Sequence, residues 1–177
     1  MSSTLDGRIH SEPKDPPVLE ALSDFTAGLP AWAQWLGIML ISAIPFVESY
    51  FGAVIGILVG LHPAVAIVAA IIGNAISMFA FVFAADVARK KVVEGRETAK
   101  EPSPRRERLK RMFDRFGVPG VSLLGQTLLP SQITSGAMVS FGASRNAVLL
   151  WQCISIVVWG VAFGLLALGG AELLSLR

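Results

Sequence analysis

Apolar residues run along this chain in two long blocks, and a basic segment separates them. Residues 31–85 contain one charged side chain, Glu48, and residues 116–171 contain one, Arg145. A soluble protein of 177 residues cannot hide such blocks inside one core, because 53% of its residues are hydrophobic and only 16% are charged. The pattern therefore predicts an all-α integral membrane protein.

A proline interrupts the middle of each block. Pro45 and Pro130 each remove a backbone donor and break the helix, and the arms on either side are too short to cross a hydrocarbon core of about 30 Å. We therefore expect two re-entrant helical hairpins, at residues 31–60 and 117–143. The residues expected to form the turns are Pro45, Pro130 and Gly136. A rival interpretation makes residues 31–60 one tilted, kinked span.

Two further apolar stretches are uninterrupted and long enough to be full transmembrane helices, at residues 63–88 and 145–170. Each follows a hairpin, so residues 31–88 and residues 116–171 form two membrane repeats of the same design. If the segment between them is cytoplasmic, the repeats have opposite orientations and form a pseudo inverted repeat, an architecture typical of secondary transporters.

The two flanking segments of the first repeat have other characters. Residues 1–16 are polar and rich in proline, as is typical of a disordered tail. Residues 17–30 place apolar side chains at three- and four-residue spacings, which predicts an amphipathic helix on the membrane surface.

Basic charge concentrates in residues 89–115, predicted to form a cytoplasmic loop with a helix beginning at Pro104. Cytoplasmic loops carry an excess of Lys and Arg, so this bias explains the segment without a nucleic-acid partner. It predicts a multi-pass protein of the plasma membrane, whose N-terminus is outside if residues 31–60 form a hairpin and cytoplasmic if they form one span. The expected partners are the lipid bilayer, further copies of the chain in a homo-oligomer, and a small-molecule or lipid substrate.

Glu48 is the strongest candidate for a functional side chain. A carboxylate at membrane depth is costly to keep and usually has a proton, cation or ion-pair role, although it can also be a water-facing glutamate without one. The polar side chains expected at the second hairpin either coordinate substrate or satisfy backbone groups that the turn frees. They are Gln126, Ser131, Gln132 and Thr134.

Other polar and small residues are expected to serve helix packing. Asn74 is expected to hydrogen-bond to a neighbouring helix. A glycine stripe would let another helix approach closely, and its members are Gly52, Gly56 and Gly60. The single cysteine, Cys153, and two isolated histidines offer no metal cluster or catalytic set, so we expect neither an enzyme nor a cofactor or metal.

Three runs of the sequence resemble bacterial membrane proteins described as small multidrug efflux or export proteins, especially those of actinobacteria. The runs are IPFVESYFGAVIG (44–56), GNAISM (73–78) and FDRFGVPGVSLLGQTLLPSQITSGAMVSFGASR (113–145). The same blocks resemble, more distantly, the DedA or SNARE-associated membrane family, which has two re-entrant hairpins and is linked to proton-coupled transport or to flipping of lipid carriers. Gln126 and Gln132 stand near positions where that family carries arginines.

The resemblance and the pattern together favour a proton-coupled efflux transporter for a small or lipophilic substrate, with Glu48 exchanging the proton. Two alternatives stay open. One is a DedA-like translocase of a lipid carrier, for which paired positive charge within the membrane is expected. The other is a scaffold that transports nothing and binds anionic lipid or a partner through its basic loop.

Overall fold

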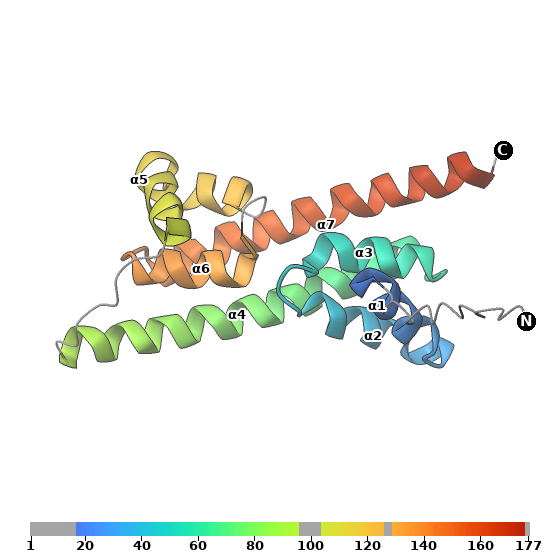
Figure 1. Ribbon diagram of the computed structural model, residues 1–177, viewed down its shortest axis with the longest axis horizontal. Coiled ribbons are helices and arrows are strands. Elements are labelled where there is room, and N and C mark those ends of the chain that lie inside the picture. Colours follow the sequence, from blue (N-terminus) through green and yellow to red (C-terminus); the bar gives the residue numbers. More distant parts are fainter. Residues whose placement is uncertain (1–16, 96–103, 126–128, 176–177) are drawn as a thin grey trace, which may run out of the picture.

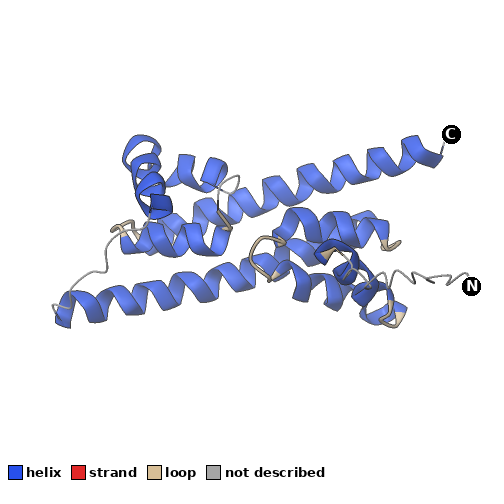
Figure 2. Ribbon diagram, viewed as in Figure 1, coloured by secondary structure: helices blue, strands red, loops and turns tan. Residues whose placement is uncertain are grey.

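The chain folds into helices joined by short turns (Figure 2). The computed structural model describes residues 17–95, 104–125 and 129–175, and within these ranges no strand occurs. The helices are α1 (Val18–Ala27), the 3₁₀ turn η1 (Ala31–Ala33), α2 (Gln34–Ser42), α3 (Glu48–Leu58), α4 (Pro63–Gly95), α5 (Pro104–Gly125), α6 (Ser131–Ser140) and α7 (Arg145–Ser175). This confirms the predicted all-helical class. The predicted tail 1–16 and part of the basic loop lie outside the described residues.

Helices α4 and α7 are the two long elements, and they run in opposite directions past each other (Figure 1). Their apolar parts, Pro63–Arg89 and Arg145–Leu173, contain 27 and 29 residues and are long and apolar enough to cross a membrane. At 1.5 Å per residue each is about 40 Å long. The expected helix 63–88 is therefore present, and α4 continues beyond it to Gly95.

Four of the other helices form two pairs, α2 with α3 and α5 with α6, and α4 packs against the first pair along one half and against α6 along the other (Figure 1). In the first pair the chain turns between Ser42 and Glu48, so that α2 and α3 each have about half the length of a span. In the second, α5 changes direction at Gly117, where φ is 64°, and its final part leads through the Pro130 turn into α6. The two breaks predicted at Pro45 and Pro130 are therefore present.

Two glycines were assigned the wrong role from the sequence. Gly60 meets no neighbouring atom within 4 Å and ends α3 with a φ of 98°, while the Leu61 N–H donates to the Gly56 carbonyl (3.0 Å). Gly136 lies inside α6, where a Cβ would be 3.6 Å from the Cβ of Ala85 on α4. Gly60 is therefore a helix-ending residue, and Gly136 is a packing residue and not part of a turn.

The other predicted packing glycines do bring helices together. A Cβ on Gly56 would lie 2.7 Å from the Ala66 Cβ, and one on Gly52 would lie 3.2 Å from the Ala70 Cβ. On α7, Gly160 and Gly164 do the same, since a Cβ on Gly160 would lie 3.0 Å from Ile71 and 3.2 Å from Ser49. This second small-xxx-small pair lets α3 and α4 pack closely on α7.

Equivalent positions in the two halves of the molecule are 83 residues apart in the hairpins and 82 residues apart in the long helices α4 and α7. Glu48 begins α3 and Ser131, 83 residues later, begins α6. The Ser49 hydroxyl donates to the Ile156 carbonyl on α7 (2.9 Å), while the Gln132 amide donates to Asn74 Oδ1 on α4 (3.0 Å). Each hairpin thus reaches the long helix of the other half, and it does so at equivalent positions.

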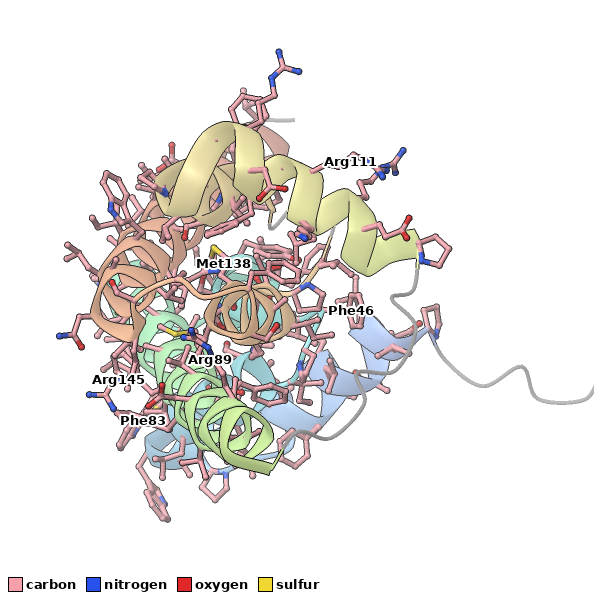
Figure 3. All side chains as sticks on the ribbon, turned by 90° about the vertical axis from the view of Figure 1, so that its left-hand side faces the viewer. Phe46, Phe83, Arg89, Arg111, Met138 and Arg145 are labelled. Atoms are coloured by element: carbon pink, nitrogen blue, oxygen red, sulfur yellow. The ribbon has the colours of Figure 1, made fainter. Side chains whose placement is uncertain are left out.

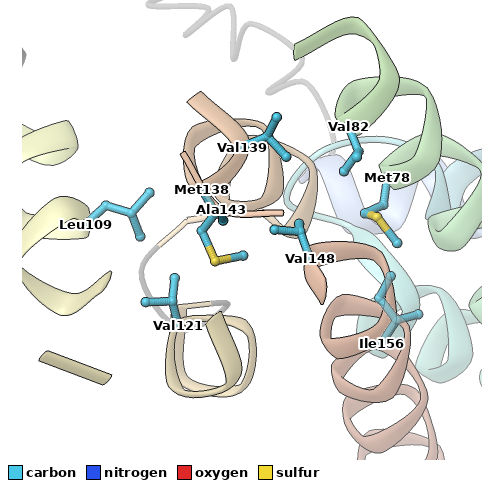
Figure 4. Close-up of a cluster of buried hydrophobic side chains, with 9 residues drawn as sticks. All are labelled: Met78, Val82, Leu109, Val121, Met138, Val139, Ala143, Val148 and Ile156. Atoms are coloured by element: carbon cyan, nitrogen blue, oxygen red, sulfur yellow. The ribbon is translucent and has the colours of Figure 1, made fainter. Parts of the chain in front are cut away.

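The main apolar core lies in the second half of the molecule (Figure 4). Its buried side chains come from four helices and include Met78 and Val82 of α4, Val121 of α5, Met138 of α6 and Val148 of α7. Burial of aliphatic side chains of this size contributes about 1.5–3 kcal/mol each when water is the reference solvent. This cluster fixes α6 against both long helices.

The C-terminal part of α4 and the start of α7 meet at one end of the molecule, where basic side chains gather (Figure 3). The Arg145 guanidinium lies 3.5 Å from the Asp86 carboxylate and 5.2 Å from the centre of the Phe83 ring. Arg111 extends from α5 at the same end. The C-terminal part of α4, which precedes the second hairpin, and the start of α7, which follows it, therefore lie at one basic end of the molecule.

Candidate functional site

The tips of the two hairpins meet in the interior of the molecule through Glu48 and Ser131. Both residues have an exposed fraction of 0%. The backbone N–H of Ser131 donates to Oε1 of the Glu48 carboxylate, and the Ser131 hydroxyl also hydrogen-bonds to this carboxylate. Because Ser131 is the first residue of α6, the carboxylate supplies an acceptor at a helix N-terminus whose own N-cap, Pro130, supplies no side-chain hydrogen bond.

Asn74 of α4 completes the contact between the hairpins. Its Oδ1 accepts a hydrogen bond from the Gln132 amide at 3.0 Å and lies 3.2 Å from the Ser131 hydroxyl oxygen. That oxygen is also 3.4 Å from Gln132 Oε1. One hydroxyl hydrogen thus has three acceptors within reach, namely the carboxylate and two amide oxygens. The predicted interhelical hydrogen bond of Asn74 is present, and its partner is the second hairpin.

The backbone of the first tip is strained at two residues. Phe46 has a φ of 75° and Glu48 a φ of 54°, the only non-glycine residues with positive φ among those described. Such conformations cost about 1–3 kcal/mol each and persist where the surroundings impose them, often at ligand sites and switches. The described residues of the second tip have no counterpart to this strain. Glu48 is thus held in a conformation that the chain does not favour by itself.

Six buried polar side-chain atoms in the described part of the chain have no hydrogen-bond partner, and two of them belong to Glu48 and Asn74 at the contact between the tips. Each such atom costs about 1–3 kcal/mol and marks a strain reservoir, a functional group or the place of a bound molecule. They are Glu48 Oε2, Asn74 Nδ2, both amide atoms of Gln152, and the hydroxyl oxygens of Ser42 and Ser122. The set contains donors as well as acceptors.

The remaining predicted site residues separate into two groups. Ser131 and Gln132 lie in the contact between the hairpins, whereas the Thr134 hydroxyl donates to the Leu129 carbonyl (3.3 Å) and satisfies a backbone group of its own turn. Gln126 lies outside the described residues. Of the two roles left open from the sequence, Thr134 takes the backbone role, while Ser131 and Gln132 face Glu48 and Asn74.

Sequence reasoning missed several buried polar residues, and three of them illustrate what was missed. The Ser49 hydroxyl bonds to α7, the Ser155 hydroxyl donates to the Ser122 carbonyl of α5 (2.7 Å), and Gln152 is buried without a partner. Gln152 stands one turn from Val148 and Ile156, both of which belong to the core that includes Met78. The available signal was the pair Gln152 and Ser155, three residues apart in an otherwise apolar helix.

Charge at the tips is restricted to one carboxylate. The buried residues that the structure describes include no Lys or Arg, and Glu48 is the only acidic residue among them. No group of three or more His, Cys, Asp or Glu side chains that could hold a metal ion occurs in the described part of the chain. The site can therefore exchange protons at Glu48 and hydrogen-bond to a polar group, and it contains no compensating cationic side chain.

Comparison of the chain with protein-family models, with curated proteins and with solved structures gives no match. The function is therefore argued from the geometry of the two hairpin tips.

Proposed function

We propose that this protein is a proton-coupled transporter of the plasma membrane. In this proposal α4 and α7 cross the bilayer, and the α2–α3 pair and the pair formed by α5 and α6 are re-entrant hairpins. Helices of 9, 11 and 10 residues in α2, α3 and α6 reach about half-way through a 30 Å core. The tips would then meet near the midplane, where inverted-repeat transporters build their sites.

The proposed orientation follows from the basic end of the molecule. Arg89 and Arg145 lie at the ends of α4 and α7 that are joined through the basic segment, and cytoplasmic loops carry an excess of such residues. This end would be cytoplasmic, so that the second hairpin opens to the cytoplasm and the first opens to the outside. The exposed apolar residues of α1, among them Val18, Leu19 and Phe25, suit a helix that lies on the outer membrane surface.

The observation that carries the proposal is the buried contact between Glu48 and the N-terminus of α6. An ionised carboxylate there accepts the Ser131 N–H and ties the two hairpins together. A protonated carboxyl group is a much weaker acceptor, so proton uptake would loosen the contact and let the halves move relative to each other. Coupling between protonation and access to the site would follow from this single contact.

The resemblance to small multidrug efflux proteins suggests a small or lipophilic substrate, and two spans with two hairpins suggest assembly as a homo-oligomer. A DedA-like lipid-carrier translocase is the less favoured function, because the described buried residues lack the positive charge that would bind a phosphate headgroup.

Reconstitution into proteoliposomes that contain the pH dye pyranine tests the proposal. The vesicles carry an imposed pH gradient. In separate experiments, ethidium, a lipophilic cation, is added on one side of the vesicle membrane and pyruvate, a small anion, on the other. We expect one of them to drive proton movement in the native protein and not in Glu48→Gln. The matched control is Glu20→Gln, since Glu20 is exposed on α1 and should leave the flux unchanged.

Proton movement that persists in Glu48→Gln would contradict the role of Glu48. If neither probe moves protons but the native protein scrambles fluorescent phospholipids between leaflets, the lipid translocase is the better function. Absence of both activities would favour the scaffold.

A further inference from the structure

We propose that the substrate of this site is a small monocarboxylate anion, which replaces the Glu48 carboxylate at the N-terminus of α6. This inference rests on the proposed function and names its substrate class. Glu48 would act as a tethered competitor that holds the anion position while the site is empty of substrate.

The electrostatic argument starts from the two helix ends. α3 begins at Glu48 and α6 begins at Ser131, and the contact between these residues brings both N-termini to one point. Each N-terminus carries roughly half a positive charge, so together they balance about one negative charge. Glu48 supplies that charge in the structure. A cation would leave the tips with excess positive charge, whereas a monoanion beside a protonated Glu48 restores the balance.

The hydrogen-bonding argument agrees with an anion. Asn74 Nδ2 is a fully buried donor with no partner, and it belongs to the side chain that already contacts Ser131 and Gln132. With the Ser131 N–H and hydroxyl, this gives a cluster of donors beside the Glu48 carboxylate, where the other acceptors are the amide oxygens of Asn74 and Gln132. A carboxylate has two oxygens that accept such bonds, and the Glu48 carboxylate uses Oε1 but leaves Oε2 unpartnered. The donors at this point therefore exceed what Glu48 uses.

The carboxylate of Glu48 is also poised to leave. The positive φ values of Phe46 and Glu48 store strain in the tip that presents it, and release of the carboxylate allows the backbone to relax. The substrate must be small and its anionic group must be single, because Glu48 and Ser131 are fully buried and the described buried residues include no cationic side chain for a second charge.

Exchange of the two carboxylates would couple proton and substrate. Both cannot be ionised on one helix N-terminus, so the substrate anion binds once Glu48 has taken up a proton. The anion and the proton then move together, and the occupied tips stay neutral. No covalent bond forms or breaks in this cycle.

Other ionisable groups around Glu48 are few. On the packed helices α2 and α6 none occurs, and α1 carries Glu20 and Asp24, which are exposed. The ionisable groups of α4 and α7 include Asp86 and Arg145, which lie at the basic end, and the thiol of Cys153. His62 precedes α4 and Glu172 lies near the end of α7. Tyr50, two residues along α3, is the titratable neighbour that interacts with Glu48. Its phenol is neutral over the pH range in which a carboxyl group exchanges its proton.

Binding of pyruvate to the purified full-length protein in detergent, measured by isothermal titration calorimetry, tests the inference. Pyruvate stays ionised between about pH 5.5 and about pH 8, so any change in its affinity over this range belongs to the protein. We expect Glu48→Gln to bind pyruvate at least about tenfold more tightly than the native protein at about pH 8, because the competing charge is gone. Native affinity should rise toward about pH 5.5, and that of Glu48→Gln should not.

A second substitution identifies the donor. Asn74→Ala in the Glu48→Gln background should reverse the gain, whereas Thr134→Val should keep it, since the Thr134 hydroxyl serves Leu129. If Glu48→Gln does not fold, the pH dependence of pyruvate affinity in the native protein and in Thr134→Val is the test. Equal or weaker binding in Glu48→Gln, tighter binding of methyl phosphate than of pyruvate, or competition by tetramethylammonium would overturn the inference.

The transport assay separates the two proposals. Pyruvate that binds as expected, in a protein for which neither pyruvate nor ethidium moves protons in proteoliposomes, would support the carboxylate site and contradict the transporter. Proton movement driven by ethidium in a protein that does not bind pyruvate would contradict the carboxylate site and support the transporter.

Discussion

The two hairpins have the same outline and bring opposite chemistry to the point where they meet. The first presents an acceptor, Glu48, on a strained backbone, while the second presents donors, the N–H and hydroxyl of Ser131, at the start of a regular helix. The second hairpin is also fixed by the larger apolar core. In the proposed transport cycle, the second hairpin would be the rigid part and the first the part that moves. Four pairs of substitutions test this difference.

The largest effect on stability is expected from two equivalent contacts, that of α2 with α4 in the first half and that of α5 with α7 in the second. A Cβ on Gly73 would overlap the backbone of Met39, with Met39 Cα only 2.8 Å away, so Gly73→Ala should lower the stability by about 3 kcal/mol or more. The equivalent contact of the second half is Ser155 with Ser122, and Ser155→Ala should cost about 1 kcal/mol. Thermal unfolding in detergent, followed by tryptophan fluorescence, measures both. Equal losses of stability in the two variants would contradict the close approach of Gly73 to the Met39 backbone.

The next effect concerns the donor at the second tip. Proline is tolerated at the first position of a helix, so Ser131→Pro removes the N–H that Glu48 accepts without breaking α6. We expect it to lower the stability by about 2–3 kcal/mol, since a buried carboxylate loses its partner, and Ser131→Ala to cost about 1 kcal/mol. Chemical denaturation of both variants gives the comparison. A Ser131→Pro protein as stable as Ser131→Ala would mean that the N–H does not hold Glu48.

Two buried glutamines should respond in opposite directions. Gln132→Leu removes the donor to Asn74 and should cost about 1–2 kcal/mol, whereas Gln152→Leu removes two unpartnered amide atoms and should raise the stability by about 1 kcal/mol. The same unfolding assay applies. A loss of stability in Gln152→Leu would show that this amide has a partner in the protein as it exists in solution.

The smallest effect is expected at the strained turn. Phe46 is exposed by 60% and has a φ of 75°, so Phe46→Gly relieves the backbone at little cost in packing. Phe46→Ala truncates the same ring but keeps the Cβ. We expect the glycine variant to be the more stable of the two by about 1 kcal/mol in thermal unfolding. The reverse order would remove the argument that the first tip is held under strain.

Much of the fold could be predicted from local patterns. The prolines at 45 and 130 break the apolar blocks, and the long helices follow from uninterrupted apolar runs. The exact turn could not be placed as well, because the polar run after Pro130 looked like a loop. It is the first turns of α6, in which Ser131, Gln132 and Ser135 are all buried. The polar residues there belong to a buried contact, but a turn on the surface would carry the same residue types, so the sequence pattern does not separate the two cases.

The residues of the candidate site were named from the sequence, but the individual contacts between them were not. Glu48 and Ser131 are 83 residues apart, and Ser49 and Ile156 are 107 apart, so no local period relates them. Gln152 was passed over, although Ser155 three residues later marks the same face of α7, because two polar residues in an apolar helix do not show which helix they pack against. Its importance depends on the orientation of α7 against α4.

The amino-acid sequence by itself determined that the two apolar blocks are helical and are broken near Pro45 and Pro130, and that one acidic residue lies within them. These features follow from proline chemistry and from hydrophobic spacing, which act over a few residues. The tertiary structure decided that the two breaks meet, that Glu48 faces the N-terminus of α6, and that Asn74 joins them. Such pairings depend on how helix faces pack over the whole molecule, where close contacts between glycines and facing side chains fix the positions of the tips.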